Sequence, residues 1–493
     1  MPDALSETPM PPGDPYELPS EGSKLLRIFA RNSVWLWLDL GGLRIGTLLA
    51  GLFLIRYFGP ANLGIYSTAL AVGWIVNAVT DLGVTRYAAR EVAASPSHRT
   101  HIVGVSLLTT VLALVVQCAL LIVAYLTGHV VLSCIAAGLI LCNFEGTSSF
   151  CSAVLTAELR SRDIIPSSVV GILGMIGMTV LVIVTHESVL FMLLGLCVKS
   201  CIALCLRLWK LRSAWPAVED WLGRHLRFVV RKAWPYFQYN ITQIGYGRIA
   251  IVCFGLVASP QKVGWFVAAF VLADIFPQWS YAGSNALLPV WTKLYETKRF
   301  QDLVELRQRL LDILVFAAVP LWIGLALFAP QICTLLGSRY ASSAPVLRIV
   351  ASRSLLSALD GFLGHGYLIA VNQVKERQRA QAKSLIILAA LSLLLGWLWG
   401  PVGVGVAMFV SDSTLILQYL RINRRVKMKI EWPAVLPASM AGAAMIVTAI
   451  ATPNSLALPI EILFVLSAYF FGLMIFSWRR LLSAGRTLRE CFG

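Results

Sequence analysis

Charged residues are scarce in this chain, and the motifs of soluble enzymes are missing. Only 13% of the 493 residues are Asp, Glu, Lys or Arg, whereas 58% are hydrophobic. A water-soluble core cannot bury that much apolar surface, so we expect lipid to be the solvent. The sequence contains no GxxxxGK[ST] phosphate loop, no HExxH zinc motif and no long polar stretch after its N-terminus. We therefore expect no ATPase module and no enzyme activity, and any work must be driven by ion gradients or substrate supply.

Cysteine use excludes a further class of protein. Nearly all ten cysteines fall within apolar stretches, which argues against the disulfide framework of a secreted domain. Cys197, Cys201 and Cys205 recur on one helix face, where packing of small residues is favoured over a metal site. We expect neither a metal nor a cofactor.

Apolar stretches of membrane-spanning length run through the whole chain. A helix needs about 20 apolar residues to cross a bilayer core. The predicted spans are 34–55, 63–84, 102–126, 130–156, 164–184, 189–208, 236–257, 263–290, 311–329, 346–370, 383–399, 402–420, 433–452 and 456–477. The sequence thus predicts an all-α polytopic membrane protein with about 14 transmembrane helices.

Basic residues gather on one side of these spans. Of the 41 Lys and Arg residues, all but eight lie in the termini and in alternate loops. The exceptions are Arg56, Lys262, Arg339 and Arg348 in the other loops and Arg44, Lys199, Arg248 and Arg353 within spans. The positive-inside rule then places both termini in the cytoplasm, with the protein in the inner (plasma) membrane. The basic side should attract anionic membrane lipids, and we expect no nucleic-acid partner.

The spans divide into two similar sets. "FGPANLGIYSTAL" from Phe58 is echoed by "ASPQKVGWFVAAF" from Ala258, so that Pro60 aligns with Pro260 and Gly64 with Gly264. In each copy, Pro starts a tight turn and Gly permits close helix approach. The predicted domains are a disordered N-terminal tail (1–23), an N-lobe with six spans (24–209), a cytoplasmic amphipathic linker (210–235), a C-lobe with six spans (236–425), and two final spans with a basic tail (426–493). Two parallel repeats should bind their substrate between them.

Basic residues inside spans are the first candidate site residues. Arg44 and Arg248 each lie near the middle of the first span of a lobe, where an unpaired charge is costly. A guanidinium binds phosphate through a planar fork of donors, so two of them would suit a diphosphate. Arg353 either adds to this site or forms a structural ion pair. For Lys199, packing or snorkelling is favoured.

Acidic residues in or near spans are the second set. Asp39, Asp81, Asp274 and Asp360 are candidates for balancing the arginines or for carrying a coupling proton or sodium ion, as is Asp412. Buried ion pairs that fix helix packing explain them equally well. Asp81 follows Asn77 by four residues and Asp274 precedes Gln278 by four, so each pair shares a helix face.

Glycines surround His365 in the stretch "DGFLGHGY" from Asp360. Gly361, Gly364 and Gly366 would weaken a helix there and let it bend, although close packing explains them as well.

The stretch "RYFGPANLGIYSTALAVGWIVNAVTDLGVTRYAAREVA", from Arg56 to Ala93, resembles the signature of oligosaccharide flippases in the multidrug/oligosaccharidyl-lipid/polysaccharide (MOP) exporter superfamily. The second half agrees through "VGWFVAAFVL", "LPVWTKL" and "GPVGVGVAMFVSD". The resemblance covers residues from about 24 to about 425.

This resemblance implies two six-helix lobes in a V shape around a central cavity, plus two C-terminal helices. It implies translocation of an undecaprenyl-diphosphate-linked oligosaccharide to the outer leaflet by alternating access, for cell-surface polysaccharide biosynthesis. Polysaccharide polymerase machinery would be a partner. Cationic cavity residues would engage the diphosphate, which fits Arg44 and Arg248. Alternatives are a cation-coupled drug antiporter of the same superfamily, a peptidoglycan-precursor flippase, and a membrane-embedded glycosyltransferase.

Overall fold

The computed structural model is helical through nearly all of its described part and contains no strand there. It describes residues 22–94, 99–212, 226–425, 435–452 and 460–475. Side chains are described from Ala50 onward, apart from positions 93, 94, 226, 279, 282, 285, 286 and 289. A helix satisfies its backbone N–H and C=O groups within one segment, which a chain in lipid requires.

The helices follow one another with short connections. They are α1 (Gly22–Thr80), α2 (Val84–Ala94), α3 (Arg99–Leu126), α4 (Val130–Ala157), α5 (Ile165–Thr185), α6 (Val189–Lys210), α8 (Leu226–Val257), α9 (Pro260–Ala273), α10 (Ile275–Glu296), α11 (Phe300–Leu327), α12 (Ala329–Leu336), α13 (Ala344–Leu359), α14 (Leu368–Ala370), α15 (Val374–Arg425) and α16 (Val435–Ala451), followed by Ile460–Ile475. Two 3₁₀ turns, η2 (Ser161–Ile164) and η4 (Ser338–Ser343), and a π-helix, η5 (Asp360–Tyr367), complete the described elements.

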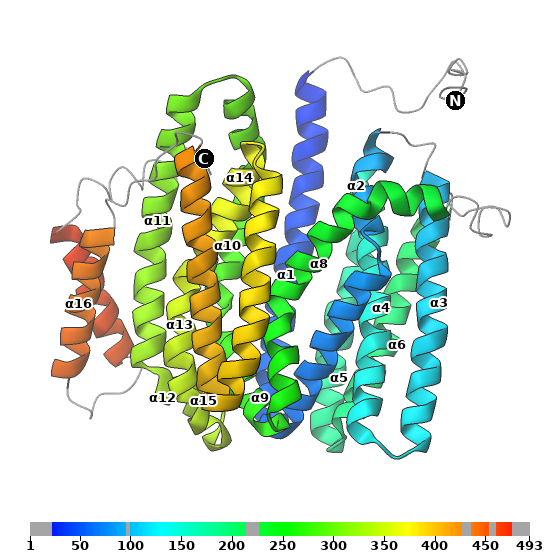
Figure 1. Cartoon of the computed structure of the whole chain (residues 1–493), viewed down its shortest axis with the longest axis horizontal. Helices are drawn as coiled ribbons and strands as arrows, with labels where there is room; N and C mark the ends of the chain where they lie inside the picture. The colour runs from blue at the N-terminus through cyan, green and yellow to red at the C-terminus, as the bar shows by residue number, and fades with distance from the viewer. Residues whose placement is uncertain (1–21, 95–98, 213–225, 426–434, 453–459, 476–493) are drawn as a thin grey trace.

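Two of these helices contain a reversal of the chain. Gly59 in α1 has φ 70° and Gly400 in α15 has φ 62°, a region that residues with a Cβ rarely adopt. Pro60 and Pro401 follow these glycines, where a fixed φ suits the start of a helix. Figure 1 shows that the chain turns back at both places.

Divided at these glycines, the helices reproduce the predicted spans. α9 and α10 together form the eighth pass, and α13, η5 and α14 form the tenth. With α1 and α15 each counted twice and with α16 and Ile460–Ile475, the described helices make fourteen passes. By length and apolar composition alone, eight described helices qualify for crossing a membrane, and three of the remaining ones are shorter apolar helices. The predicted all-α polytopic fold is confirmed.

The seventh pass starts earlier than the sequence predicts. α8 begins at Leu226, so the end of the predicted linker 210–235 is helical, while residues 213–225 lie outside the described part. Figure 1 shows that α8 bends, and Pro235 within it removes one helix hydrogen bond. Most of the predicted tail 1–23 and, within the predicted final segment 426–493, all of residues 476–493 also lie outside the described residues.

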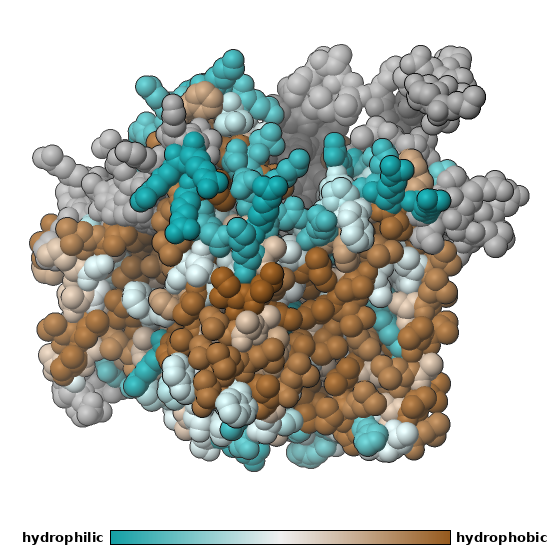
Figure 2. All heavy atoms as spheres, viewed as in Figure 1, coloured by the Kyte–Doolittle hydropathy of each residue, from teal (hydrophilic) through white to brown (hydrophobic). Residues whose placement is uncertain are grey.

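The surface separates into a polar end and an apolar band. Figure 2 shows hydrophilic residues at the end that carries α2, with a hydrophobic zone below it. We call the end with α2 and the turns at 296–300 and 371–374 the basic end, and the end with Gly59 and Gly400 the opposite end. Large apolar side chains such as Val116 and Trp397 are exposed, as side chains facing lipid should be.

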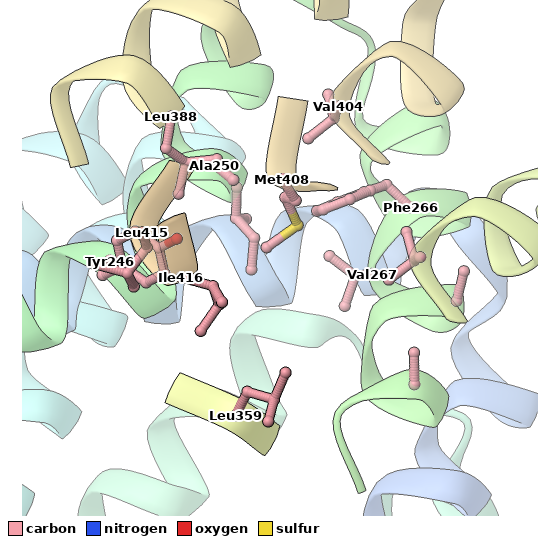
Figure 3. Packing of buried hydrophobic residues seen from close by; sticks show 14 of the residues in the cluster. Tyr246, Ala250, Phe266, Val267, Leu359, Leu388, Val404, Met408, Leu415 and Ile416 are labelled. Atoms are coloured by element: carbon pink, nitrogen blue, oxygen red, sulfur yellow. The ribbon is translucent and has the colours of Figure 1, made fainter. Parts of the chain in front are cut away.

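One hydrophobic cluster joins the two halves of the chain. Figure 3 shows its packing around Tyr246 and Ala250 of α8, Phe266 of α9 and Met408 of α15. Leu63 of α1 belongs to the same cluster. The core therefore fixes α1 against α8 and α9, which positions the site described next.

Candidate functional site

The two halves meet at the opposite end through the turns that repeat in the sequence. A Cβ on Gly64 would lie 1.8 Å from the carbonyl oxygen of Pro260, and a Cβ on Gly264 would lie 1.8 Å from that of Pro60. Only a hydrogen atom fits at such a distance, so both positions require glycine. Figure 1 shows α9 beside the turn of α1 at this end. The close approach at these glycines is therefore made between the two copies, which pack directly on each other.

A second contact holds the end of the first pass. The Tyr340 hydroxyl, in η4, donates a hydrogen bond of 2.6 Å to the carbonyl oxygen of Ile55. Tyr340 is almost fully buried. Since η4 belongs to the second half and Ile55 to the first, this bond also closes the opposite end.

The halves are in contact at the basic end as well. Asn240 Nδ2 of α8 donates to Asp81 Oδ2 at 3.2 Å, and Arg90 Nη1 of α2 donates to the Tyr236 hydroxyl at 2.8 Å. A Cβ on Gly83, which has φ +79°, would lie 2.3 Å from the backbone nitrogen of Phe237. Thus α2 and the end of α1 are packed tightly against α8.

Arg248 lies between the halves in the middle of α8. Its side chain is partly buried and forms no hydrogen bond or ion pair within the described part of the structure. The groups that act on it electrostatically include Tyr66 and Cys142 from the first half and Asp274 from the second. A cation held there without a paired carboxylate favours an anionic ligand, and a guanidinium suits phosphate.

Arg353 is paired within the second half. Its Nε donates to Asp412 Oδ2 at 2.7 Å, and its Nη1 lies 4.0 Å from Asp274 Oδ1. Tyr246 donates its hydroxyl proton to the other oxygen of Asp412. The Phe270 ring lies 5.3 Å from the guanidinium carbon. This is the arrangement expected of a structural ion pair, and a role of Arg353 in binding diphosphate stays a prediction.

Asp274 occupies the break between α9 and α10. Gln278 Nε2 donates to Asp274 Oδ2 at 2.7 Å, so the predicted polar pair on one face is confirmed. The carboxylate thus lies 4.0 Å from the Arg353 guanidinium, and the charge of Arg248 acts on it without forming an ion pair among the described residues.

Asp360 begins the π-helix η5 and accepts two hydrogen bonds from tyrosines. Tyr281 donates to Oδ2 at 2.6 Å and Tyr419 to Oδ1 at 2.9 Å. A Cβ on Gly366 would lie 2.1 Å from the Trp291 ring. The close packing that explains the glycines is present, the helix is irregular here, and a bend stays a prediction.

A buried polar chain continues from η5 towards α15. His365 Nε2 lies 2.7 Å from Gln243 Oε1, and Arg377 Nη2 donates to the same oxygen at 3.1 Å. Arg377 is fully buried, and its guanidinium lies 5.2 Å from the centre of the Tyr239 ring. It holds α15 against α8 near the basic end.

Lys199 has a partner that the sequence analysis did not consider. Its Nζ lies 2.7 Å from Glu145 Oε1, which also accepts from Ser200. Cys197 Sγ donates to the carbonyl of Ala137 at 3.4 Å, in line with the packing interpretation of the cysteines. The first half therefore neutralises Lys199 internally.

Two predicted site residues cannot be placed in this way. Arg44 and Asp39 lie on α1, but their side chains belong to the stretch 22–49, outside the described side chains. Their assignments stay predictions.

The sequence analysis missed several buried polar residues. Glu145 was a detectable signal, because it is a charge within a predicted span. Arg377 was assigned to a basic loop, and no signal marked Tyr246, Tyr281 or Tyr419 as carboxylate partners. A tyrosine hydroxyl within a span donates its hydrogen bond to whichever acceptor tertiary packing places beside it. The spacing of residues along one helix does not show which acceptor that is.

Fourteen passes, repeated turns that pack on each other and charges buried between helices define a polytopic helical membrane protein of two packed halves. The fold is similar to that of "Lipid II flippase MurJ, inward closed conformation", with a TM-score of 0.71 and 15% identity over 92% of this chain and 100% of that one. It is also similar to an inward-facing multidrug resistance MATE family transporter of the MOP superfamily, with a TM-score of 0.57 and 13% identity. That match covers 78% of this chain and 96% of the transporter. The fold is thus shared with both of these structures.

The chain belongs to the polysaccharide biosynthesis protein family, whose pattern matches residues 30–295, more than half of its length. No curated protein matches it in sequence.

Proposed function

We propose that this protein translocates an undecaprenyl-diphosphate-linked oligosaccharide from the cytoplasmic to the outer leaflet by alternating access. Membership of the polysaccharide biosynthesis protein family supports a glycan substrate. The structural relative MurJ is described as a lipid II flippase, which is the same class of work on another lipid-linked saccharide. The protein moves its substrate and catalyses no reaction on it.

The orientation in the membrane follows from charge. Most Lys and Arg residues lie in the termini and in the alternate loops that include the turns at 296–300 and 371–374, so the positive-inside rule assigns the basic end to the cytoplasm. The contact between Gly64 and Gly264 then closes the side of the outer leaflet or periplasm. Alternating access requires this contact and the one at α2 and α8 to open in turn.

Arg248 is the observation that carries the substrate class. It lies between the halves, it is partly buried, and its charge has no paired carboxylate among the described residues. A diphosphate would supply the missing negative charge and accept both arms of the guanidinium fork. Arg44 would act with it from α1.

Direct binding tests this role. Purified wild type should bind undecaprenyl-diphosphate oligosaccharide, and Arg248→Ala should bind it about 10- to 100-fold more weakly, the loss expected for one charged hydrogen-bonding group. Arg248→Lys keeps the charge and should recover part of the affinity. Arg309→Gln is the matched control, since Arg309 pairs with Glu305 on an exposed helix face. Equal affinity of wild type and Arg248→Ala would contradict the proposal.

Two alternatives differ in observable ways. A cation-coupled drug antiporter of the same superfamily would confer resistance to a cationic dye when overexpressed. A peptidoglycan-precursor flippase would be essential for growth, whereas loss of a surface-polysaccharide flippase would remove only the polymer. Arg248 suits an anionic diphosphate lipid and not a cationic drug, and membership of the polysaccharide biosynthesis protein family favours the oligosaccharide over the peptidoglycan precursor.

A further inference from the structure

Glu145 and Lys199 form an ion pair within the first half, at the middle of α4 and of α6. Lys199 Nζ and the Ser200 hydroxyl both donate to Glu145 Oε1, at 2.7 and 2.5 Å. The stem of Lys199 crosses Gly174 of α5, where a Cβ would lie 2.3 Å from the lysine Cγ. Glycine therefore keeps the path of the lysine open. Three helices thus hold this carboxylate in one position.

Charge balance does not use the whole hydrogen-bonding capacity of the Glu145 carboxylate. A carboxylate accepts at about four positions on its two oxygens, and both donors bind Oε1. Oε2 forms no hydrogen bond within the described part of the structure. A hydrogen bond to an ionised oxygen is about twice as strong as one between neutral groups. Oε2 is therefore a strong acceptor that the protein itself leaves unused.

The accessible side of Glu145 is expected to face the interior of the protein. Its side chain is 37% exposed although it lies deep among protein atoms. Of the eight described helices that qualify as spans, α4 is the most buried. Ser149, one turn further along the same face of α4, is exposed as well. Since an ionised pair at mid-span is costly beside lipid, its accessible surface belongs to a water-filled interior.

Tyr66 of α1 lies near both this carboxylate and Arg248. The charges of Glu145 and of Arg248 both act on its hydroxyl, and both also act on Cys142 of α4. The Tyr66 hydroxyl is not enclosed, and it forms no hydrogen bond within the described part of the structure. Groups from α1, α4 and α8 with unused hydrogen-bonding capacity therefore lie beside one another.

These groups suit a neutral ligand rich in hydroxyls. Lys199 cancels the charge of Glu145, so the pair attracts neither a cation nor an anion strongly. The carboxylate accepts, the ammonium keeps spare N–H groups and the phenol of Tyr66 does both, which matches sugar hydroxyls because each of them donates and accepts. In a glycosyl diphosphate the first sugar is bonded directly to phosphate. With the diphosphate at Arg248, that sugar would lie beside Tyr66 and Glu145.

We propose that Glu145, Lys199 and Tyr66 form a subsite for the first sugar of the lipid-linked glycan, in which Glu145 Oε2 accepts a sugar hydroxyl. The subsite rests on the proposed function, because the diphosphate at Arg248 brings the sugar to it. Recognition of a hydroxyl by a buried polar group discriminates strongly, since an analogue without that hydroxyl leaves the group unpaired. Glu145 is thus a specificity-determining residue for the transported glycan.

The test compares lipids with and without a sugar on the purified full chain. The ligands are undecaprenyl diphosphate and its conjugates with one glucose, one galactose or one N-acetylglucosamine. Wild type should bind at least one conjugate about 10- to 100-fold more tightly than undecaprenyl diphosphate, the gain expected of hydrogen bonds to a charged group. Arg248→Ala should weaken the binding of all of these lipids, because each of them carries the diphosphate.

Glu145→Gln keeps an oxygen for Lys199 and Ser200 but removes the charged acceptor. It should reduce the gain from the sugar about tenfold and should bind undecaprenyl diphosphate as wild type does. Glu305→Gln makes the same change on a side chain that is 61% exposed, and it should keep the whole gain. An ion pair that only fixes α4 against α6 would instead affect lipids with and without sugar alike, so the ratio of the two affinities separates the roles.

Should Glu145→Gln fail to fold, Tyr66→Phe decides the question, because it removes one hydroxyl and should reduce the gain about two- to tenfold. Equal affinity of wild type for all of these lipids would overturn the subsite and leave the diphosphate site standing. A gain that both variants retain in full would do the same. No binding of any of these lipids to folded wild type would contradict the proposed function, and the subsite with it.

Discussion

Buried charges in this protein differ in whether the protein itself balances them. Arg353 with Asp412 and Lys199 with Glu145 are satisfied within one half each. Arg248 has no such pair among the described residues. A balanced charge is expected to stabilise the fold, and an unbalanced one to bind a ligand, so single substitutions should separate the two roles.

Removal of one member of a balanced pair should destabilise the protein. Arg353→Ala leaves Asp412, whose side chain is 5% exposed, buried without its cation, which costs about 3–5 kcal/mol. The double variant Arg353→Met with Asp412→Leu removes both charges and should recover most of the stability. Thermal unfolding in detergent measures the stability of the single and the double variant. If Arg353→Ala unfolds at the wild-type temperature, the ion pair contributes nothing and the assignment is wrong.

Partners of buried charges could not be predicted from spacing. Asp360 lies near Arg353 on the same helical face in sequence, yet Arg353 pairs with Asp412, 59 residues away on α15. Asp360 is instead satisfied by Tyr281 and Tyr419. The charges themselves were evident as costly exceptions within apolar spans. Which helix faced them depended on tertiary packing.

At the scale of elements, the crossing of α1 and α9 at Gly64 and Gly264 is the tightest inter-half contact on the opposite side. Each glycine approaches the carbonyl of the other copy's proline, so the two turns fit only without side chains. The sequence predicted tight turns and close helices from the Pro and Gly spacing. It did not show that the two copies contact each other, because such a contact joins residues 200 positions apart.

A side chain at either glycine should force the opposite end apart. Gly64→Val or Gly264→Val places a Cβ 1.8 Å from a carbonyl oxygen, so the helices must separate. We expect inserted protein with impaired transport and faster hydrogen exchange in η4 and α9. Gly247→Val in α8 has no neighbour within 4 Å of its Cβ and serves as the control. Wild-type exchange in both glycine variants would show that this contact is not a closed gate.

The turn at Gly400 allows a stability test of a single element. Its φ of 62° and ψ of −142° belong to a region that is essentially restricted to glycine. Gly400→Ala should lower the free energy of unfolding by about 1–3 kcal/mol through backbone strain, although its Cβ meets no neighbour. Gly177→Ala, within α5 and equally open, carries no such strain and should raise it by up to about 1 kcal/mol through higher helix propensity. Equal effects of both substitutions would rule out strain at the turn.

At the scale of the whole molecule, hydropathy and charge predicted most of the fold. Fourteen passes followed from apolar length, since lipid leaves few alternatives to helices. The break at Asp274 was not predicted, because a broken helix has the same composition as a straight one, whereas the glycines around His365 indicated a weakened helix where η5 lies. How the two halves pack against each other could be seen only in the tertiary structure.

Orientation is testable in intact cells. His129→Cys lies on an exposed turn of the opposite end, and Thr297→Cys on an exposed turn of the basic end. A membrane-impermeant maleimide should label the first from outside and the second only after permeabilisation, with the parent chain as the background. The reversed pattern would contradict cytoplasmic termini.

Translocation itself tests the central proposal most directly. Proteoliposomes would carry a fluorescent undecaprenyl-diphosphate oligosaccharide, and a membrane-impermeant quencher would report which leaflet holds it. Wild type should render the inner-leaflet probe accessible, while Arg248→Ala should not and Arg309→Gln should. If folded wild type moves no such lipid under a sodium or a proton gradient, with several glycans tried, the flippase proposal is contradicted.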